Sequence, residues 1–401
     1  MPDPFAFHSR RWGRLLFPAL ATLGAVTLAV GLLVEPHRTW ANVLLLSNYL
    51  IGLSTGSLVL IALLYVSGAR WSTPLRRLPE ALAFALPLGG LGLAAVLLFH
   101  PSLYPWVAHS AGDEETISPL RTLWLGRPFF LLRSLAYLAI WMTFAMAIIR
   151  NSRLQDKTGD PALTRRNIHL SAGFLVAFGI TCWLSSSDWL MSLEPDWTST
   201  VFGVYHFAGL FQSALAAVVL LAVLLRGRSP LRTFLTEDRL HDLGKLLFAF
   251  SSFWMYTWFC QYLVIWYTNH PEETTYYLRR LVGPWPAVMF LDLVLNWGIV
   301  FLVLLFRDAK RQPIILAAVA LCALVGRWVD LSLIIFPSQG DTFATPGIIE
   351  AGLALGAFGL FGSTVTLALA QAPLVPVHDP LLGSTSSEHL NTSSASDLRA
   401  P

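Results

Sequence analysis

Charge and cysteine are both scarce in this 401-residue chain. Asp, Glu, Lys and Arg together make up 13% of the residues, about half the share that soluble domains usually carry. The three cysteines, Cys182, Cys260 and Cys322, lie far apart and form neither a CxxC nor a CxxCH motif. The low charge excludes an ordinary soluble protein. The cysteine spacing predicts that the chain holds no covalent haem, no iron–sulfur cluster and no metal of its own.

Long apolar runs fill the chain instead, and hydrophobic residues account for 55% of it. A helix crosses a membrane with about 20 mainly apolar residues, because a rise of about 1.5 Å per residue must span about 30 Å of hydrocarbon. We therefore expect an all-α polytopic membrane protein. Its ten transmembrane helices are expected at 15–34, 42–67, 81–99, 128–149, 168–191, 200–225, 245–267, 285–306, 313–336 and 346–370.

The lysines and arginines predict the orientation of these helices. Twenty of the 27 lie in or beside the termini and alternate connections on one face, whereas five lie in the connections on the other face. Basic connections remain in the cytoplasm, so both termini are expected there. The net charge of +3 reflects this topology and gives no reason to expect nucleic-acid binding.

Three regions follow from this topology. We expect a short cytoplasmic arm at 1–14, a single membrane domain at 15–370 and a cytoplasmic tail at 371–401. The tail is rich in Pro, Ser and Thr, a composition typical of disorder unless a partner holds the segment in place.

Charged side chains inside the runs gather near the outer ends of the helices. A charge in hydrocarbon costs a few kcal/mol or more, so such residues usually face the bundle interior or a wet cavity and mark function. Neutral amides lie at similar depths. We therefore predict an outer-facing polar cavity, built from Arg133, Asp188, His206, Asp292, Arg327 and Asp330 with Gln261 and Asn296.

Purely structural roles remain open for each of these residues. Arg327 and Asp330 are three residues apart and can pair along one helix face. Arg133 can extend its charged end to the interface, and Asp188 can face interfacial water. His206 alone is more often a hydrogen-bonded core histidine than a ligand, and a haem held by His206 and His100 is disfavoured.

The inner halves of the helices carry few ionisable groups. A proton that entered from the cytoplasm would need ordered waters along the scattered hydroxyl groups of Thr143, Ser251, Ser252 or Tyr256. We therefore expect proton exchange with the outer face only.

Two long motifs resemble a known family. The first is Asp-Trp-Leu-Met-Ser-Leu-Glu-Pro-Asp-Trp at 188–197, followed by Ser-Thr-Val-Phe-Gly-Val-Tyr at 199–205. The second is Ile-Trp-Tyr-Thr-Asn-His-Pro-Glu-Glu-Thr at 265–274, and Val-His-Asp-Pro at 377–380 adds to it. With ten helices, these stretches resemble the NrfD/PsrC-like membrane subunits. Among them they are most similar to the ActF type, the second such subunit of bacterial alternative complex III.

The resemblance implies a fold and a function that the residues alone do not give. It implies two four-helix bundles, formed by helices 2–5 and 6–9 and flanked by helices 1 and 10. It also implies a quinol:electron-acceptor oxidoreductase whose haem c and iron–sulfur clusters lie in partner subunits. The paralogous NrfD-like subunit would oxidise menaquinol or ubiquinol, and this chain would support assembly and a proton route.

Three other functions remain open from the sequence. The chain could bind quinol directly, which requires an aromatic slot beside an acid. It could be a secondary transporter, although its Gly and Pro interruptions lie mainly at helix ends rather than at the midplane that such proteins favour. It could also be a structural scaffold without a proton route.

Overall fold

The computed structural model describes residues 11–109, 123–229, 231–340, 347–380 and 382, and within these ranges all regular structure is helical. Among the described residues, nine spans are long and apolar enough to cross a membrane, as expected of a multi-pass membrane protein. They are α1 (Arg11–Val34), α2 (Pro36–Val66), α3 (Arg77–Ala83) with α4 (Leu86–Phe99), α7 (Arg127–Thr158), α8 (Ala162–Trp189), α9 (Phe202–Leu225), α13 (Trp285–Leu293) with η4 (Val294–Gly298) and α14 (Ile299–Leu304), α16 (Pro313–Ile335) and α17 (Ile348–Ala370).

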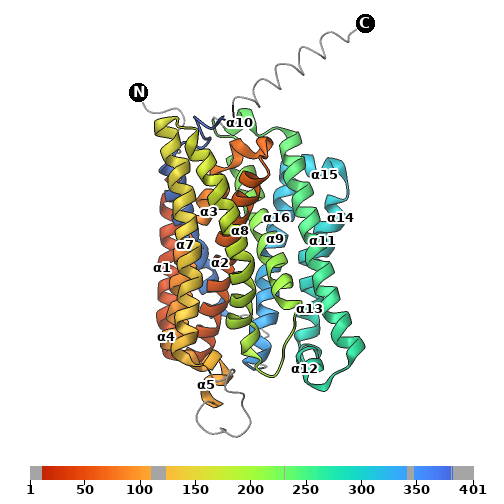
Figure 1. Ribbon diagram of the computed structural model, residues 1–401. Coiled ribbons are helices and arrows are strands. Elements are labelled where there is room, and N and C mark those ends of the chain that lie inside the picture. The colour runs from red at the N-terminus through yellow and green to blue at the C-terminus, as the bar shows by residue number, and fades with distance from the viewer. Residues whose placement is uncertain (1–10, 110–122, 230, 341–346, 381, 383–401) are drawn as a thin grey trace.

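A further long helix, α11 (Glu237–Thr268), contains the seventh expected run. It extends along the molecule beside the others (Figure 1). Its sequence is less apolar than theirs, because polar and aromatic residues such as Ser251, Ser252, Tyr256 and Gln261 interrupt it. The shorter helices lie in the connections: η1 (Arg70–Leu75), η2 (Pro101–Leu103), α5 (Pro105–His109), η3 (Met191–Leu193), α10 (Leu231–Phe234), α12 (Pro271–Arg280), α15 (Arg307–Arg311) and η5 (Phe336–Ser338).

The connections separate onto two ends of the molecule. Helices α10 and α15 lie at one end, and α5 and α12 lie at the opposite end (Figure 1). We call the first the basic end, after the arginines of α10 and α15, and the second the acidic end, after Glu272 and Glu273 of α12. The connections thus alternate between the two ends of the molecule. This agrees with the two faces to which the lysines and arginines assign them.

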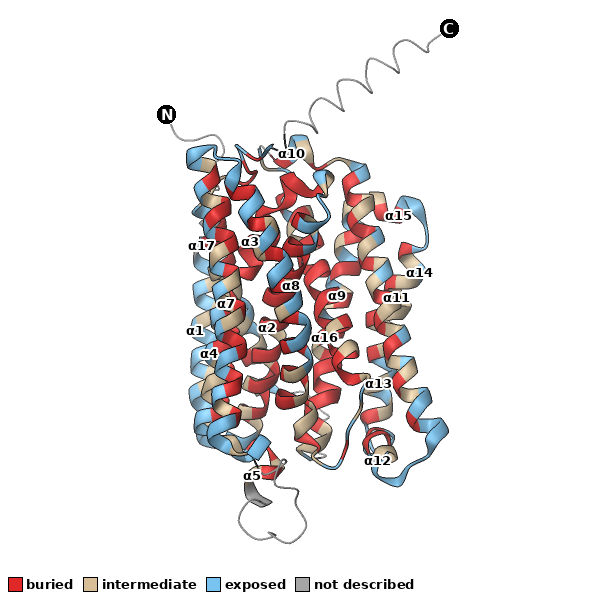
Figure 2. Ribbon diagram, in the orientation of Figure 1, coloured by how far each residue is buried: buried red, intermediate tan, exposed pale blue. Residues whose placement is uncertain are grey.

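Helices α2 and α9 form the centre of the packing. They contact each other, α2 also packs on α4 and α8, and α9 also packs on α11 and α16. Both are apolar around their whole circumference and mostly buried, as such helices are in a bundle, whereas α1 and α7 expose one face (Figure 2). Helix α1 packs along α17 at the periphery.

The third expected helix is not continuous. The span expected at 81–99 lies within the apolar span Arg77–Phe99, which is interrupted because α3 ends at Ala83 and α4 starts at Leu86. Pro87 explains the break: it has no N–H to donate to the carbonyl of Ala83, and its ring would clash with that carbonyl in a regular helix.

The eighth expected helix contains a π-helical segment. Residues Val294–Gly298 form η4 between α13 and α14. No proline or glycine pattern in the sequence marked this position, and the segment carries Asn296, one of the predicted site residues. Single π turns inside α-helices often lie at functional sites.

The structure agrees with the expected tail boundary but not with disorder in the first part of the tail. Helix α17 ends at Ala370. Beyond it, Leu374 and Val375 are buried and Asp379 is 5% exposed, so this part of the expected 371–401 tail packs against the protein itself. Residues 383–401 and residues 1–10 of the arm expected at 1–14 lie outside the described residues, whereas residues 11–14 belong to α1.

Candidate functional site

Asp292 is fully buried on α13. Its Oδ1 accepts a hydrogen bond of 2.7 Å from Asn296 Nδ2, whereas its Oδ2 has no hydrogen-bond partner. The backbone carbonyl of Asn296 accepts two more bonds, from Gln212 Nε2 and Ser251 Oγ, each at 2.6 Å. Gly326 on α16 lies so close that a Cβ there would be 2.8 Å from Asn296 Cγ. Three neighbouring helices, α9, α11 and α16, thus contact Asn296, and Asn296 donates to one oxygen of Asp292.

A small cavity adjoins Asp292. The space open to the centres of water molecules is about 20 Å³, which is enough for one or two waters. Gln261, Tyr205, Tyr276 and Arg280 also line it. Gln261 Oε1 is buried and, like Asp292 Oδ2, has no hydrogen-bond partner. The cavity therefore offers both the room and the polar partners that a buried water needs.

Arg327 and Asp330 form an ion pair that is almost completely buried. Tyr205 donates its hydroxyl to the other oxygen of Asp330, and Arg327 Nη2 lies 3.0 Å from His206 Nδ1. The guanidinium group occupies the place where a Cβ of Gly209 would lie, so α9 approaches α16 only because this residue has no side chain. The pairing along one helix face, predicted from the three-residue spacing, is confirmed.

Arg133 and Asp188 form a second buried pair, between α7 and α8. The contact is bidentate: Nε to Oδ2 is 2.9 Å and Nη2 to Oδ1 is 2.7 Å. Tyr137 donates its hydroxyl to Oδ2 at 3.0 Å, and the Arg133 guanidinium lies 4.0 Å from the ring centre of Trp124. Arg133 is therefore turned inward, and Asp188 is 2% exposed rather than open to interfacial water.

The charged residues predicted for one chamber fall into separate sets. Within the described residues, no hydrogen bond or ion pair joins the Arg133–Asp188 pair to the group around Arg327. Asp292 lines the cavity directly, whereas Asp330 reaches it through Tyr205, which touches both. His100 contacts His37 rather than His206.

The hydroxyl groups considered for an inner path differ in their positions. Ser251 lies inside and binds the carbonyl of Asn296. Tyr256 is 64% exposed on α11, and Thr143 is exposed and bonds only back to Ala139 of its own helix. Tyr256 and Thr143 therefore do not line an internal path toward Asp292.

Helix α12 covers the cavity at the acidic end, through contacts that the sequence did not reveal. Arg280 is buried and donates to the backbone carbonyls of Leu333, Ile334 and Tyr276 at 2.8, 3.2 and 2.6 Å. Its Nη2 also binds Glu194 Oε1 at 2.9 Å. Both charged residues lie in connections, where the sequence gives no sign that they are buried.

An aromatic stack also holds α12 over the cavity. The rings of Trp197 and Tyr276 are nearly parallel, with centres 3.9 Å apart. Tyr276 lines the cavity, so the stack fixes one of its walls. The connection between α8 and α9 and the helix α12 thus form one rigid cover.

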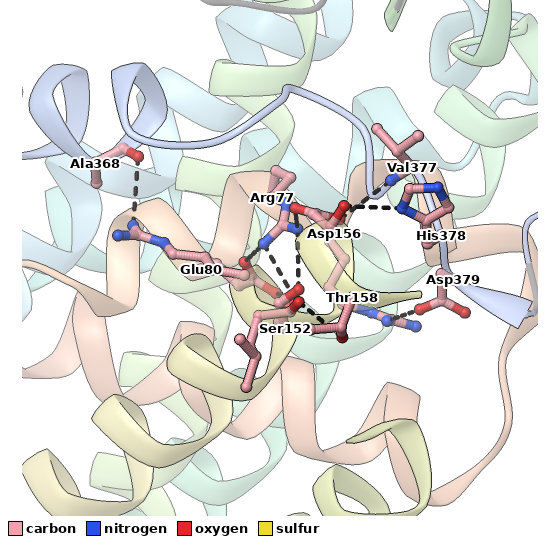
Figure 3. A network of polar contacts seen from close by, with 12 residues as sticks. Arg77, Glu80, Ser152, Asp156, Thr158, Ala368, Val377, His378 and Asp379 are labelled. Atoms are coloured by element: carbon pink, nitrogen blue, oxygen red, sulfur yellow. Dashed lines mark hydrogen bonds and ion pairs between the residues drawn. The ribbon is translucent and has the colours of Figure 1, made fainter. Parts of the chain in front are cut away.

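A buried ion network at the basic end was also missed (Figure 3). Arg77 pairs with Glu80 on its own helix and with Asp156 on α7. Ser152 donates to Glu80 at 2.6 Å and accepts from Arg77 at 3.1 Å. The expectation that the inner halves of the apolar runs carry few ionisable groups did not extend to these residues. The charges lie in α3 and near the C-terminal end of α7, outside the apolar runs in which charges were sought.

The segment after α17 completes this network (Figure 3). Asp379 pairs with Arg76, and both are nearly fully buried. The backbone N–H of Val377 donates to Asp156 Oδ1 at 3.2 Å, and His378 Nδ1 donates to the Asp156 carbonyl at 2.8 Å. The Val-His-Asp motif at 377–379 is thus a structural clasp between the tail and α7.

No family model and no curated protein matches this chain. The motifs that carried the family resemblance nevertheless occupy defined places in the structure. Asp188 pairs with Arg133, Trp189 Nε1 donates to Ser134 Oγ at 3.0 Å, and Glu194 binds Arg280. The 188–197 stretch therefore ties α7, α8 and α12 together at the acidic end.

Proposed function

We propose that this chain is a membrane subunit of a quinol:electron-acceptor oxidoreductase of the alternative complex III type, and that it carries protons between Asp292 and the acidic end. One observation carries the proposal. A fully buried carboxylate keeps one oxygen unpaired beside a cavity with room for water. A carboxyl group that served packing alone would have both oxygens bonded, because an unsatisfied buried acceptor costs about 1–3 kcal/mol.

The proton step assigns a role to each residue at the cavity. Water in the cavity delivers a proton to Asp292 Oδ2, while Asn296 holds Oδ1 and fixes the direction of the free oxygen. Gln261 Oε1 accepts from the same water. The Arg327–Asp330 pair lies next to Tyr205, which donates its hydroxyl to Asp330, and holds this tyrosine at the wall of the cavity.

The helix contacts support the proposed architecture of ten spans. Helices α2, α4, α7 and α8 contact one another in a ring, and α9, α11, α13–α14 and α16 form a second ring. In this proposal the rings correspond to the two four-helix bundles, and α1 and α17 lie outside them. The basic end then faces the bacterial cytoplasm, where both termini are proposed to lie.

Electron transfer takes place in the partners of the proposed complex. An iron–sulfur subunit and multihaem cytochrome c subunits carry the electrons, and the paralogous membrane subunit oxidises menaquinol or ubiquinol. The small size of the cavity beside Asp292 supports quinol oxidation in a partner subunit rather than in this chain. Its volume of about 20 Å³ is far below the roughly 300–1,000 Å³ of sites that bind organic ligands.

Two measurements test the proposal. Mass spectrometry of the tagged chain, purified from its own membrane, should identify multihaem and iron–sulfur subunits. Asp292→Asn keeps an acceptor for Asn296 but cannot take up a proton. We expect the complex to assemble and its quinol turnover to fall at least tenfold, whereas Asp196→Asn at the exposed surface leaves turnover unchanged. Normal turnover in the Asp292 variant would contradict the proton route and favour a purely structural role for this chain. Purification of the chain without redox subunits would contradict its assignment to such a complex.

One observation favours a second candidate, a secondary transporter. The η4 segment interrupts the span beside Asp292, and transporters place broken helices at their binding sites. Uptake of a small solute by proteoliposomes of this chain alone, driven by a proton gradient and lost in Asp292→Asn, would support that candidate.

A further inference from the structure

Two histidines from distant parts of the chain face each other at the acidic end. His37 lies in the first turn of α2, and His100 is the residue that ends α4. His37 Nδ1 is 3.3 Å from His100 Nε2, and the two rings meet edge to face with centres 5.6 Å apart. His37 is exposed and His100 is half-buried, so the pair is open to solutes from outside the bundle.

Neighbouring side chains fix the orientation of the His100 ring. Trp40 lies one turn along α2 from His37 and stacks on the His100 ring, with centres 6.1 Å apart and planes 11° apart. Phe99 also stacks on Trp40, with ring centres 6.3 Å apart. The hydroxyl of Ser102 lies 3.4 Å from the same His100 Nε2. The two nitrogens are therefore held in place by packing as well as by their mutual contact.

The separation of the nitrogens matches the geometry of a shared metal ligand pair. Two imidazole nitrogens at about 2.0–2.1 Å from a tetrahedral ion lie about 3.3 Å apart. We propose that His37 and His100 bind one divalent cation of borderline softness, Cu²⁺ or Zn²⁺, with water and the Ser102 hydroxyl in the remaining positions. The site is independent of the proton route proposed for Asp292.

The chemistry of the pair selects the cation. Imidazole suits Cu²⁺ and Zn²⁺, whereas Ca²⁺ and Mg²⁺ prefer oxygen ligands. A metal takes only the neutral ring. Cu²⁺ should bind more tightly than Zn²⁺, because affinity for nitrogen ligands rises to copper along the first-row metals.

A bound cation would connect two segments that are 63 positions apart in the sequence. It would tie the start of α2 to the start of the connection between α4 and α7. Because it binds the folded arrangement and not the separated segments, it should stabilise the acidic end in proportion to the logarithm of its concentration.

The test uses the full-length chain, purified in detergent and freed of metal with a chelator. Cu²⁺ is titrated into the wild type, His37→Ala, His100→Ala and the double variant, with His270→Ala as the matched control. His270 is an exposed histidine at the same end that precedes α12. Binding is followed by equilibrium dialysis and by the nitrogen hyperfine pattern in the electron paramagnetic resonance spectrum of Cu²⁺.

We expect one copper site with two nitrogen ligands in the wild type and in His270→Ala. Each single variant should bind Cu²⁺ at least tenfold more weakly, and the double variant should lack the site. His37 is exposed, so its replacement should leave the metal-free unfolding temperature unchanged, and that temperature is recorded for every variant. Equal affinities and spectra in the wild type and the folded His37→Ala variant would overturn the proposal.

Discussion

Arg327 donates a hydrogen bond from Nη2 to Nδ1 of His206, 3.0 Å away, while its Nη1 pairs with Asp330. A guanidinium group has donors only, so Nδ1 of His206 must be the acceptor and carry no proton. His206 is therefore the neutral imidazole with its proton on Nε2. Its place in the group is that of a fixed acceptor, and a proton could reach Nδ1 only after this bond had broken.

The Arg327–Asp330 pair should be essential for stability. Asp330→Asn leaves the Arg327 guanidinium buried without a counter-ion, which costs about 3–5 kcal/mol. We expect a large fall in the thermal unfolding temperature of the purified chain. Asp196→Asn, at an exposed position, should change stability by less than about 0.5 kcal/mol. A stable Asp330→Asn variant would mean that Arg327 has a different partner.

Gly209→Ala should disturb the same pair from the opposite helix. An added Cβ would occupy the position of the Arg327 guanidinium, and forcing an extra group into a packed core costs about 1–3 kcal/mol. Gly227→Ala is the matched control, because no atom lies within 4 Å of the Cβ that it would add. Thermal unfolding of both variants checks the prediction, which fails if the two changes have equal effects.

The sequence predicted how deep each charged residue lies within its helix better than it predicted which residues that side chain contacts. Asp292, Arg327 and Asp330 were identified because hydropathy shows how far each residue lies inside its run. The spacing of three residues also gave the Arg327–Asp330 contact. Contacts between helices, such as those of Arg133 with Asp188, could not be predicted, because they depend on which helices become neighbours.

Charged residues in the connections were the larger omission. Glu194 and Arg280 lie outside the apolar runs, so their sequence positions resemble those of ordinary loop charges. They are buried only because α12 folds back over the bundle. The π segment at Val294–Gly298 was equally hidden, since hydropathy shows the depth of a run but not the hydrogen-bonding pattern within its helix.

The clasp formed by the tail should contribute to stability as well. Asp379→Asn leaves Arg76 buried beside Tyr65 without its carboxylate, at a cost of about 3–5 kcal/mol. Asp308→Asn is the control, since Asp308 is exposed at the same end. We expect thermal unfolding to start earlier in the Asp379 variant only. Replacing both partners with apolar residues, as in Arg76→Met with Asp379→Leu, should restore much of the loss.

Buried tyrosines outside the spans should make the acidic end sensitive to alkali. Burial is the main cause that raises the pKa of Tyr104, Tyr276 and Tyr277 above the ordinary value of 10.0. A phenol whose pKa is higher in the folded state favours folding in its neutral form. Its contribution is therefore constant below pH 10 and is lost as the pH rises above 10 toward the folded pKa.

Tyr276→Phe separates this effect from general alkaline damage. Phe keeps the ring that stacks on Trp197 but removes the hydroxyl that must stay neutral. Between about pH 9 and pH 11 the variant should lose less stability than the wild type, because one ionisation that opposes folding is gone. Unfolding temperatures across this range provide the measurement, and absorbance at about 295 nm reports how many phenols ionise before unfolding. Parallel curves for the two proteins would show that Tyr276 ionises freely in the folded state and that α12 does not seal the cavity from solvent.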